Sequence, residues 1–319
     1  MDDIIMVLNS SESQELDAVA QHLCKQPGEV DSDQWVASAR TAWETVPTMY
    51  RSRIRAFRRG SGPSGVLVIR GLHVHDNELP NTPATRGSVQ RVPSVPAALL
   101  LMTACGLGDP AAFLAEKSGA LVQDVVPVPG QEEFQGNAGS VDLMMHNENA
   151  FHLHRPDFVM LLCLRADHEG TAGLRTASIR RALPLLSDRS IDTLARPEFS
   201  TQAPPSFGGV NAQGVQHPVL LGDKTDPDIK VDFAATHGLT LAAREALAEL
   251  DECLDKVAIT IRLGPGDLAV ADNRVCLHGR TAFQPRYDGR DRWLQRTFAF
   301  ADLRRSRDYR TGDGYVLMR

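Results

Sequence analysis

The chain has 319 residues, of which 42% are hydrophobic and 23% are charged, and its formal net charge is −6. This composition is that of a globular protein with enough apolar side chains for a sizeable core. An acidic chain without a basic stripe is a poor candidate for binding nucleic acid or anionic membranes. There is no recognisable secretory signal, and the five scattered cysteines lack a CxxC pair, so we expect reduced thiols in a cytoplasmic protein.

The first sixty residues predict helices. Apolar side chains recur at helical spacing in residues 11–25 and again in residues 32–57, and Pro47 is expected to break or kink the second stretch. A cluster of arginines between residues 51 and 59 is interpreted as a solvated helix face. Residues 1–60 are therefore expected to form a helical decoration of the fold.

A strand, a loop and a helix are predicted next. Residues 66–70 form a short β-rich run, and residues 80–96 are rich in Pro, Asn, Thr and Ser and predict a loop. Residues 97–105 predict a helix that ends at Gly106. The longest mostly apolar run, residues 95–105, is far too short to span a bilayer.

From residue 120 onward, short β-type runs alternate with Gly, Pro, Asp and Asn, and helices are expected only at 178–186 and 240–254. This pattern predicts a mainly β chain with flanking helices, in a double-stranded β-helix or jelly roll of the cupin-like kind and in one domain over residues 1–319. Residues 202–214 are rich in Gly, Pro, Ser and Asn, which is typical of a mobile active-site loop or of a passive surface loop. The predicted strands are 120–128, 141–146, 158–164, 218–221, 229–233, 257–263, 267–270, 274–278 and 293–301.

His146 and Glu148 form the central motif, because a single residue separates them at the end of a predicted strand. Side chains two apart on a strand point to the same face, so both would reach one point at the mouth of a barrel. An imidazole and a carboxylate are two of the three ligands in the facial triad of non-haem Fe(II) oxygenases. The motif alone is weak, since ten histidines in a chain with 40 acidic residues predict roughly one chance match.

His278 offers a third ligand, since it ends a β-rich run that follows the turn at 265–267. Arg292 and Arg296 lie where the last predicted strand begins and, being four residues apart, project from the same face. Buried guanidiniums are costly unless each meets an anion. Two carboxylates would satisfy them, one from 2-oxoglutarate and one from an amino acid, but surface arginines on an edge strand remain the alternative interpretation.

Several ordered motifs lie between residues 119 and 296. They are Gly119-Ala-Leu-Val-Gln-Asp-Val-Val-Pro-Val-Pro-Gly130, Asn137-Ala-Gly-Ser140, His146-Asn-Glu-Asn-Ala-Phe-His152, Arg155-Pro-Asp-Phe158, Cys163-Leu-Arg-Ala-Asp167, Ala177-Ser-Ile-Arg-Arg-Ala-Leu-Pro184 and the run from His278 to Arg296. Together they resemble the clavaminate synthase-like group of Fe(II)/2-oxoglutarate oxygenases in the TauD-like superfamily. That group includes free arginine, asparagine and lysine hydroxylases, and the resemblance covers roughly residues 95–302.

The resemblance implies a double-stranded β-helix with iron on His146, Glu148 and His278. It also implies that Arg292 binds the distal carboxylate of 2-oxoglutarate and that Arg296 binds the α-carboxylate of the substrate. Its other implied substrate contacts are Asn137, Glu116 and Asp232, and Phe151 is expected to line the pocket wall.

One position departs from the group. Its members commonly have a threonine shortly before the Ala-Ser at the start of a helix, where the hydroxyl assists the arginine that holds 2-oxoglutarate. That position is Leu174 in this chain. Thr171 and Thr176 lie nearby and are the candidates to replace the missing hydroxyl.

We therefore expect a dioxygenase that uses Fe(II), 2-oxoglutarate and O₂ to hydroxylate a free amino acid or a derivative, in the biosynthesis of a specialised metabolite such as an antibiotic. Desaturation or ring closure are possible outcomes of the same chemistry. The sequence shows no clear pair of acidic residues that would bind a guanidinium group, which disfavours free arginine as the substrate. Two other classes stay open: a zinc-dependent hydrolase or isomerase on a cupin-like barrel, which the lack of an HExxH motif disfavours, and a non-catalytic ligand-binding barrel.

Overall fold

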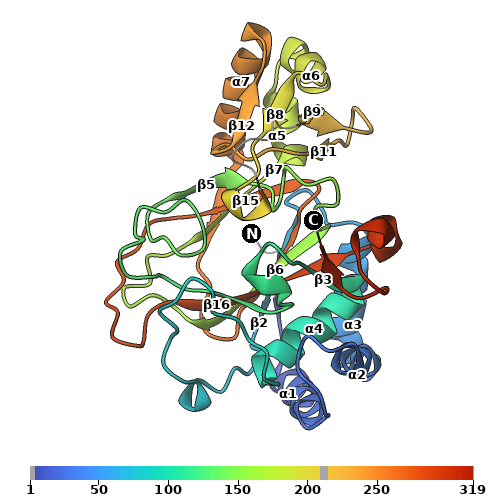
Figure 1. Cartoon of the computed structure of the whole chain (residues 1–319), viewed down its shortest axis with the longest axis vertical. Coiled ribbons are helices and arrows are strands. Elements are labelled where there is room, and N and C mark those ends of the chain that lie inside the picture. Colours follow the sequence, from blue (N-terminus) through green and yellow to red (C-terminus); the bar gives the residue numbers. More distant parts are fainter. Residues whose placement is uncertain (1–3, 209–214, 319) are drawn as a thin grey trace.

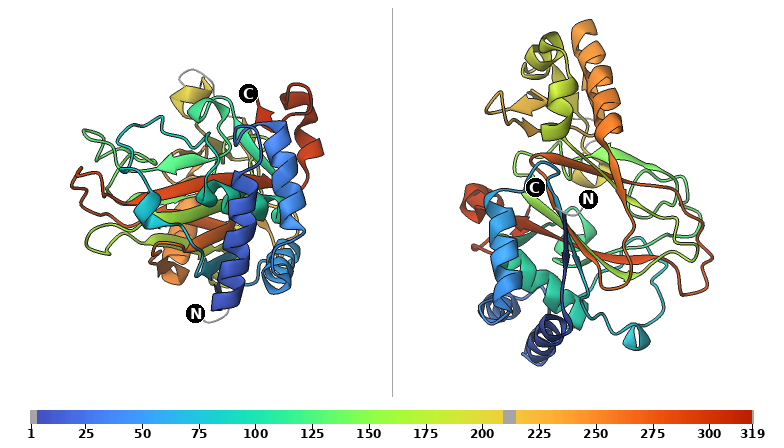
Figure 2. Two further views of the ribbon diagram at one scale, coloured as in Figure 1. Left: turned by 90° about the horizontal axis from the view of Figure 1, so that it is seen from below. Right: turned by 180° about the vertical axis from the view of Figure 1, so that it is seen from behind.

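The computed structural model describes residues 4–208 and 215–318. Helices gather at two opposite ends of the molecule with strands between them, and the view from behind agrees (Figures 1 and 2). Among the described residues, no helix is long and apolar enough to cross a membrane. One end holds α1 (Ser10–Cys24), α2 (Asp33–Trp43), α3 (Thr48–Arg59) and α4 (Val95–Leu107), and the other holds α6 (Asp188–Leu194) and α7 (Leu241–Val257).

The N-terminal helices begin where the sequence predicts. Asn9 caps α1 in a capping box with Glu12, and Ser32 caps α2 through its side-chain oxygen. Pro47 lies between α2 and α3, so the predicted break is confirmed. The prediction of helices alone was wrong for β1 (Ile5–Val7), which pairs in parallel with β2 (Val66–Arg70).

The larger sheet carries one wall of the site and the main core. Its strands run in the order β1-β2-β14-β6-β16-β3-β17, and β4 pairs with β16. Most neighbours are antiparallel, and β16 lies between β6 and both β3 and β4. The further bounds are β3 (Asp109–Phe113), β4 (Gln123–Val125), β6 (Phe158–Arg165), β14 (Leu268–Asp272), β16 (Trp293–Phe300) and β17 (Val316–Leu317).

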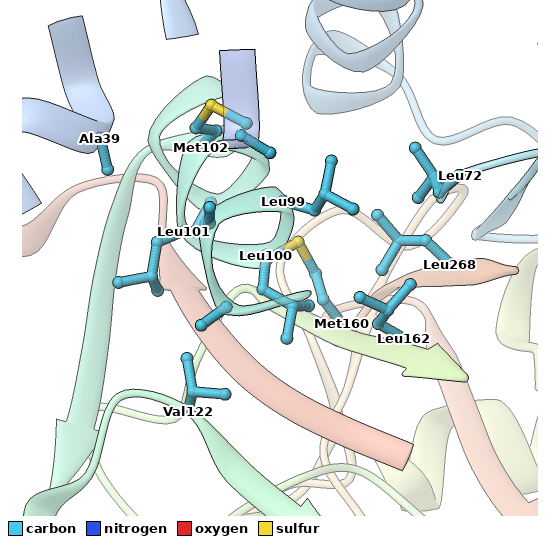
Figure 3. Packing of buried hydrophobic residues seen from close by; sticks show 14 of the residues in the cluster. Ala39, Leu72, Leu99, Leu100, Leu101, Met102, Val122, Met160, Leu162 and Leu268 are labelled. Atoms are coloured by element: carbon cyan, nitrogen blue, oxygen red, sulfur yellow. The ribbon is translucent and has the colours of Figure 1, made fainter. Parts of the chain in front are cut away.

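Helix α4 is buried on nearly all sides and packs against this sheet. Figure 3 shows its leucines beside Met160, Leu162 and Leu268 of the sheet, with Ala39 of α2 on the other side. The predicted end at Gly106 was wrong, because the helix continues to Leu107. Gly106 instead permits close packing, since an added Cβ would lie 2.4 Å from the Trp43 ring.

A second, four-stranded sheet has the order β13-β7-β15-β5 and carries the other wall of the site. Its strands are β5 (Leu143–His146), β7 (Leu174–Ser178), β13 (Ile259–Ile261) and β15 (Cys276–Arg280). A three-stranded sheet, β12-β8-β9, lies near α7 and consists of β8 (Phe199–Thr201), β9 (Gln216–His217) and β12 (Thr236–Gly238). The pair β10 (Leu220–Leu221) and β11 (Asp228–Ile229), helix α5 (Ile179–Ala182) and the 3₁₀ turns η2 (Asp76–Glu78), η3 (Lys117–Gly119), η4 (Leu183–Leu185), η5 (Pro205–Phe207) and η6 (Leu303–Tyr309) complete the elements used below.

A β-rich chain with flanking helices is confirmed, although α-helices hold slightly more residues than strands, and the predicted strands are present but mostly shorter. Residues 229–233 are an example, because only Asp228–Ile229 is a strand and Asp232 forms an isolated bridge beyond it. The predicted helix at 178–186 is split into α5 and η4. The cysteines are free thiols, as expected.

Candidate metal centre and substrate site

Three side chains converge where β5 and β15 pair at the edge of the four-stranded sheet. His278 lies directly across from His146 in the strand register, and their ring centroids are 4.5 Å apart. Glu148 approaches His278, with Oε2 3.6 Å from Nε2. One ligand atom from each of the three lies within 4.8 Å of the others. The structure therefore brings together the three predicted ligands.

The backbone positions Glu148 differently from the prediction, which relied on the alternation of side chains along one strand. Strand β5 ends at His146, so Glu148 is not on the same strand. Two buried asparagines position it instead: Asn147 donates its amide to the carbonyls of Asn273 and Cys276 at 3.0 and 3.2 Å. Asn273 accepts from the Glu148 backbone N–H at 2.8 Å and donates to the Glu148 carbonyl at 3.0 Å. Neither asparagine was singled out from the sequence.

The donor set fits a divalent first-row metal such as Fe(II). Nδ1 of His146 lies 2.8 Å from the Met144 carbonyl, which only accepts, so Nδ1 carries the proton and Nε2 is free to ligate. Burial lowers the pKa of His278, which favours the neutral imidazole that a metal requires. Two neutral imidazoles and one carboxylate on one side of a site are the facial triad.

Arg296 lies beside the three predicted ligands and has several protein partners. It is 3% exposed, and its Nη1 donates to Oε2 of Glu148 at 2.9 Å. Its Nη2 donates to Glu116 and to Gln123. The amide of Asn137, with its oxygen turned toward Arg296, accepts from both Nη1 and Nη2 at 3.2 Å. Gln123 is a neighbour that the sequence did not identify.

The two carboxylates of this cluster have pKa values shifted in opposite directions. Burial opposes ionisation of Glu148, but Arg296 and His278 outweigh burial and lower its pKa. Burial raises the pKa of Glu116 despite the same arginine, and the charge of Glu148 adds to that effect. The two acids keep the pKa of Arg296 raised against its burial. Glu148 is thus the permanent anion of the cluster.

Arg292 has contrasting surroundings. It is 7% exposed, its guanidinium lies 5.5 Å from the centre of the Phe283 ring, and β16 begins just after it at Trp293. Within residues 4–208 and 215–318, no hydrogen bond or ion pair is found for its guanidinium. Burial accordingly lowers the pKa of Arg292. No carboxylate of the described residues forms an ion pair with this buried cation, and the charge of Asp167 only partly offsets its burial.

Of the two candidate threonines, Thr176 lies on strand β7 and Thr171 lies just before that strand. Thr176 is 1% exposed and lies directly across from His278, and its hydroxyl has no partner in the described part of the chain. Thr171 is exposed, and its hydroxyl already donates to Asp167 at 3.0 Å. Leu174, which lies between them in the sequence, packs into an apolar cluster. The structure therefore favours Thr176 and does not bring the Thr171 hydroxyl to the site.

Of the remaining predicted residues, Glu116 and Asp232 lie close to the predicted ligands, and Phe151 packs against a neighbouring aromatic ring. Glu116 directly precedes η3, where Lys117 and Ser118 have positive φ angles of 47° and 54°. Asp232 bridges His146 in the backbone, which places it next to a ligand. Phe151 packs edge-on against Phe207 of η5, with ring centroids 4.8 Å apart. Residues 209–214 of the predicted active-site loop lie outside the described residues.

A family model and two relatives match most of this chain. The model for "Taurine catabolism dioxygenase TauD, TfdA family" matches residues 63–298. L-asparagine oxygenase from Streptomyces coelicolor is 60% identical over 313 residues, which cover 98% of this chain and 94% of the relative. Clavaminate synthase 2 from Streptomyces clavuligerus is 34% identical over 90% of each chain.

Solved structures agree with the sequence matches. An asparagine oxygenase in complex with Fe(II), 2S,3S-3-hydroxyasparagine and succinate superposes with a TM-score of 0.97 at 59% identity, covering 99% of both chains. The non-haem iron oxygenase OrfP in complex with Fe and α-ketoglutaric acid superposes with a TM-score of 0.89 at 28% identity, covering 98% of this chain and 99% of the other.

Proposed function

The chain belongs to the taurine catabolism dioxygenase TauD, TfdA family, and we propose that it uses Fe(II), 2-oxoglutarate and O₂ to hydroxylate free L-asparagine. The single observation that carries the substrate is the 60% identity to L-asparagine oxygenase over 98% of this chain. The superposed asparagine oxygenase complex contains 2S,3S-3-hydroxyasparagine, which makes C3 the proposed position of oxidation. The inferred resemblance to clavaminate synthase-like enzymes is confirmed by these matches.

We propose that the two larger sheets form the walls of a double-stranded β-helix within one domain. His146 on β5 and His278 on β15 lie next to Glu148, and Glu148 accepts a hydrogen bond from Arg296 of β16, which fits the inner face of such a barrel. The relatives include clavaminate synthase and an enduracididine β-hydroxylase, which supports a role in specialised metabolism.

The side chains divide the proposed reaction between them. His146, Glu148 and His278 would hold Fe(II), which when bound supplies the redox chemistry that converts 2-oxoglutarate and O₂ to succinate and CO₂ and hydroxylates the substrate. Arg292 would receive the distal carboxylate of 2-oxoglutarate in a bidentate pair, assisted by the free hydroxyl of Thr176.

The polar groups around Arg296 would orient the amino acid. Arg296 would bind the α-carboxylate, and Glu116 and Asp232 would meet the α-ammonium. Asn137, which lies against Arg296, offers an amide that can both donate to and accept from the amide side chain of the substrate. Phe151 would close the apolar wall of the site. The protein would thereby hold the C3–H bond toward the metal and exclude water.

The alternatives are not favoured. A zinc hydrolase or isomerase has no use for a dicarboxylate co-substrate, whereas Arg292 is a buried cation that still needs an anion. A non-catalytic barrel would not need the intact donor set at His146, Glu148 and His278. The sequence matches are to oxygenases and hydroxylases that act on amino acids or related compounds.

The test is aerobic incubation with Fe(II), ascorbate, 2-oxoglutarate and a panel of free amino acids that includes asparagine, glutamine, aspartate, lysine and arginine. Mass spectrometry would follow succinate and the amino acid together. We expect succinate and a product heavier by one oxygen with asparagine, and neither with Glu148→Ala. Succinate formation that survives in Glu148→Ala would refute the metal site, and turnover of another amino acid would replace asparagine as the substrate.

A further inference from the structure

A second group of buried polar side chains connects Asp232 to the three-stranded sheet β12-β8-β9, outside the predicted metal site. Asp232 bridges His146, and the next residue, Phe233, donates its backbone N–H to the Met145 carbonyl at 3.2 Å. The segment that carries Asp232 therefore lies along the edge of β5, where it ends at the ligand. Oδ1 of Asp232 accepts from the Ala234 backbone N–H at 2.9 Å, so whatever fixes this segment also fixes the Asp232 carboxylate relative to His146.

Four hydrogen bonds in series lead away from Asp232 into the three-stranded sheet. The Asp232 backbone N–H donates to Thr236 Oγ1 at 2.9 Å, and Thr236 Oγ1 lies 2.8 Å from Thr201 Oγ1. Thr201 Oγ1 lies 2.8 Å from Nε2 of His217, and Nδ1 of His217 lies 2.8 Å from the Pro218 carbonyl. The two threonines are each 3% exposed and His217 is 8% exposed, so water is almost excluded.

Only one assignment of protons satisfies this series with a neutral histidine, and burial lowers the pKa of His217, which favours that form. The Pro218 carbonyl can only accept, so Nδ1 of His217 carries the proton and Nε2 is an acceptor. Thr201 must then donate to His217 and accept from Thr236. Thr236 must donate to Thr201, so its oxygen is left to accept from Asp232. The series ends at the Asp232 backbone N–H, which can only donate, so the direction of the hydrogen bonds cannot be reversed.

We propose that Thr201, Thr236 and His217 are positioning residues that hold Asp232 against the predicted ligand His146, so that its carboxylate meets the substrate. This inference rests on the proposed function. Its physical basis is that each buried group in the series uses its neighbour, so removal of one hydroxyl leaves buried groups without partners and frees the Asp232 turn. None of the three side chains needs to touch the substrate.

The central hydroxyl gives the sharpest test. Thr201→Val keeps the shape and removes the hydroxyl, Thr201→Ser restores it, and His237→Ala changes an exposed histidine on β12 as a matched control. In Thr201→Val we expect the KM for asparagine to rise roughly tenfold, the KM for 2-oxoglutarate to stay unchanged, and less hydroxylated product per succinate. Thr201→Ser and His237→Ala should behave like the unmodified protein.

Hydrogen exchange supplies a readout that does not depend on turnover. In Thr201→Val the amide of Asp232 should lose protection, while amides in α4 keep theirs, and Thr201→Ser should retain protection at Asp232. Unchanged protection at Asp232, or a parallel rise in the KM values of both asparagine and 2-oxoglutarate, would overturn the proposal. If the unmodified protein oxidised no amino acid while Thr201→Val still lost protection at Asp232, the proposed function would fail and the positioning series would stand.

Discussion

Two buried arginines at the start of β16 lie four residues apart in opposite electrostatic surroundings. Arg296 is surrounded by Glu148, Glu116, Gln123 and the Asn137 amide. Arg292 lies against the Phe283 ring, and the described part of the chain offers its guanidinium no hydrogen bond or ion pair. The sequence argument that each arginine needs an external anion therefore applies to Arg292 and not to Arg296.

The difference matches two kinds of ligand. A dicarboxylate such as 2-oxoglutarate brings net negative charge, so its far end gains most at a buried cation that has no counter-ion. A zwitterionic amino acid brings one charge of each sign and leaves the net charge unchanged. It can exchange one internal pair, Arg296 with Glu116, for two new pairs, carboxylate with Arg296 and ammonium with Glu116. The unpaired site is thus suited to the co-substrate and the paired site to the substrate.

The largest expected effect comes from Glu148, which pairs with Arg296 and is the proposed carboxylate ligand of the metal. In Glu148→Gln the metal would lose its charged ligand, and several kcal/mol of transition-state stabilisation corresponds to a fall in kcat/KM of about a thousandfold or more. Succinate formation in parallel with metal content by atomic absorption would measure it. Full metal occupancy with near-normal turnover would contradict the assignment of Glu148.

The same substitution at the two arginines should have opposite consequences for the free protein. Arg296→Met would leave two buried carboxylates without their cation and should lower the free energy of unfolding by about 3–5 kcal/mol. Arg292→Met removes a buried charge that forms no ion pair with the described residues, so it should leave the stability unchanged or raise it. Urea unfolding of the metal-free proteins would measure both, and equal destabilisation would contradict the comparison.

Arg292 should instead be needed for the co-substrate. Arg292→Met should raise the KM for 2-oxoglutarate on the order of a hundredfold and leave the KM for asparagine nearly unchanged. Arg290→Met is the matched control, because Arg290 lies two residues away, is 57% exposed and pairs with Asp76. Steady-state succinate formation at varied 2-oxoglutarate would measure the effect. A control variant as impaired as Arg292→Met would point to damage of the loop instead.

The parts of the site that the sequence predicted are those that local motifs carry. His146, Glu148 and His278 were found because their spacing and a family resemblance are visible in the chain itself. Glu148 was expected on the same strand as His146, and that was wrong, because the asparagine pair that positions it joins residues 125 positions apart. Such contacts depend on pairings that no local pattern reveals.

The short strands explain the other omissions. Strands β8, β9 and β12 have two or three residues each, which is too short for alternation of polar and apolar side chains to predict a strand. Strand β7 was not predicted either, so the register that sets Thr176 opposite His278 was unknown. Without that register, Thr171 and Thr176 were equivalent candidates. The fold class was easier, because it needs only many short β-type runs with turn residues between them.

The smallest expected effect concerns the two threonines, which differ as the two arginines do: one has a protein partner for its polar group and the other has none among the described residues. Thr176 has a buried hydroxyl without a partner in the described chain, so Thr176→Val should leave the free protein as stable or more stable. Its KM for 2-oxoglutarate should rise roughly five- to tenfold, since one hydrogen bond to the distal carboxylate would be lost. Thr171→Val should leave that KM unchanged and slightly destabilise the loop, because its hydroxyl donates to Asp167. If Thr171→Val alone raised the KM for 2-oxoglutarate, the loop that carries Thr171 would have to rearrange when 2-oxoglutarate binds. The unpartnered hydroxyl of Thr176 in the unliganded protein would then not mark a contact with the co-substrate.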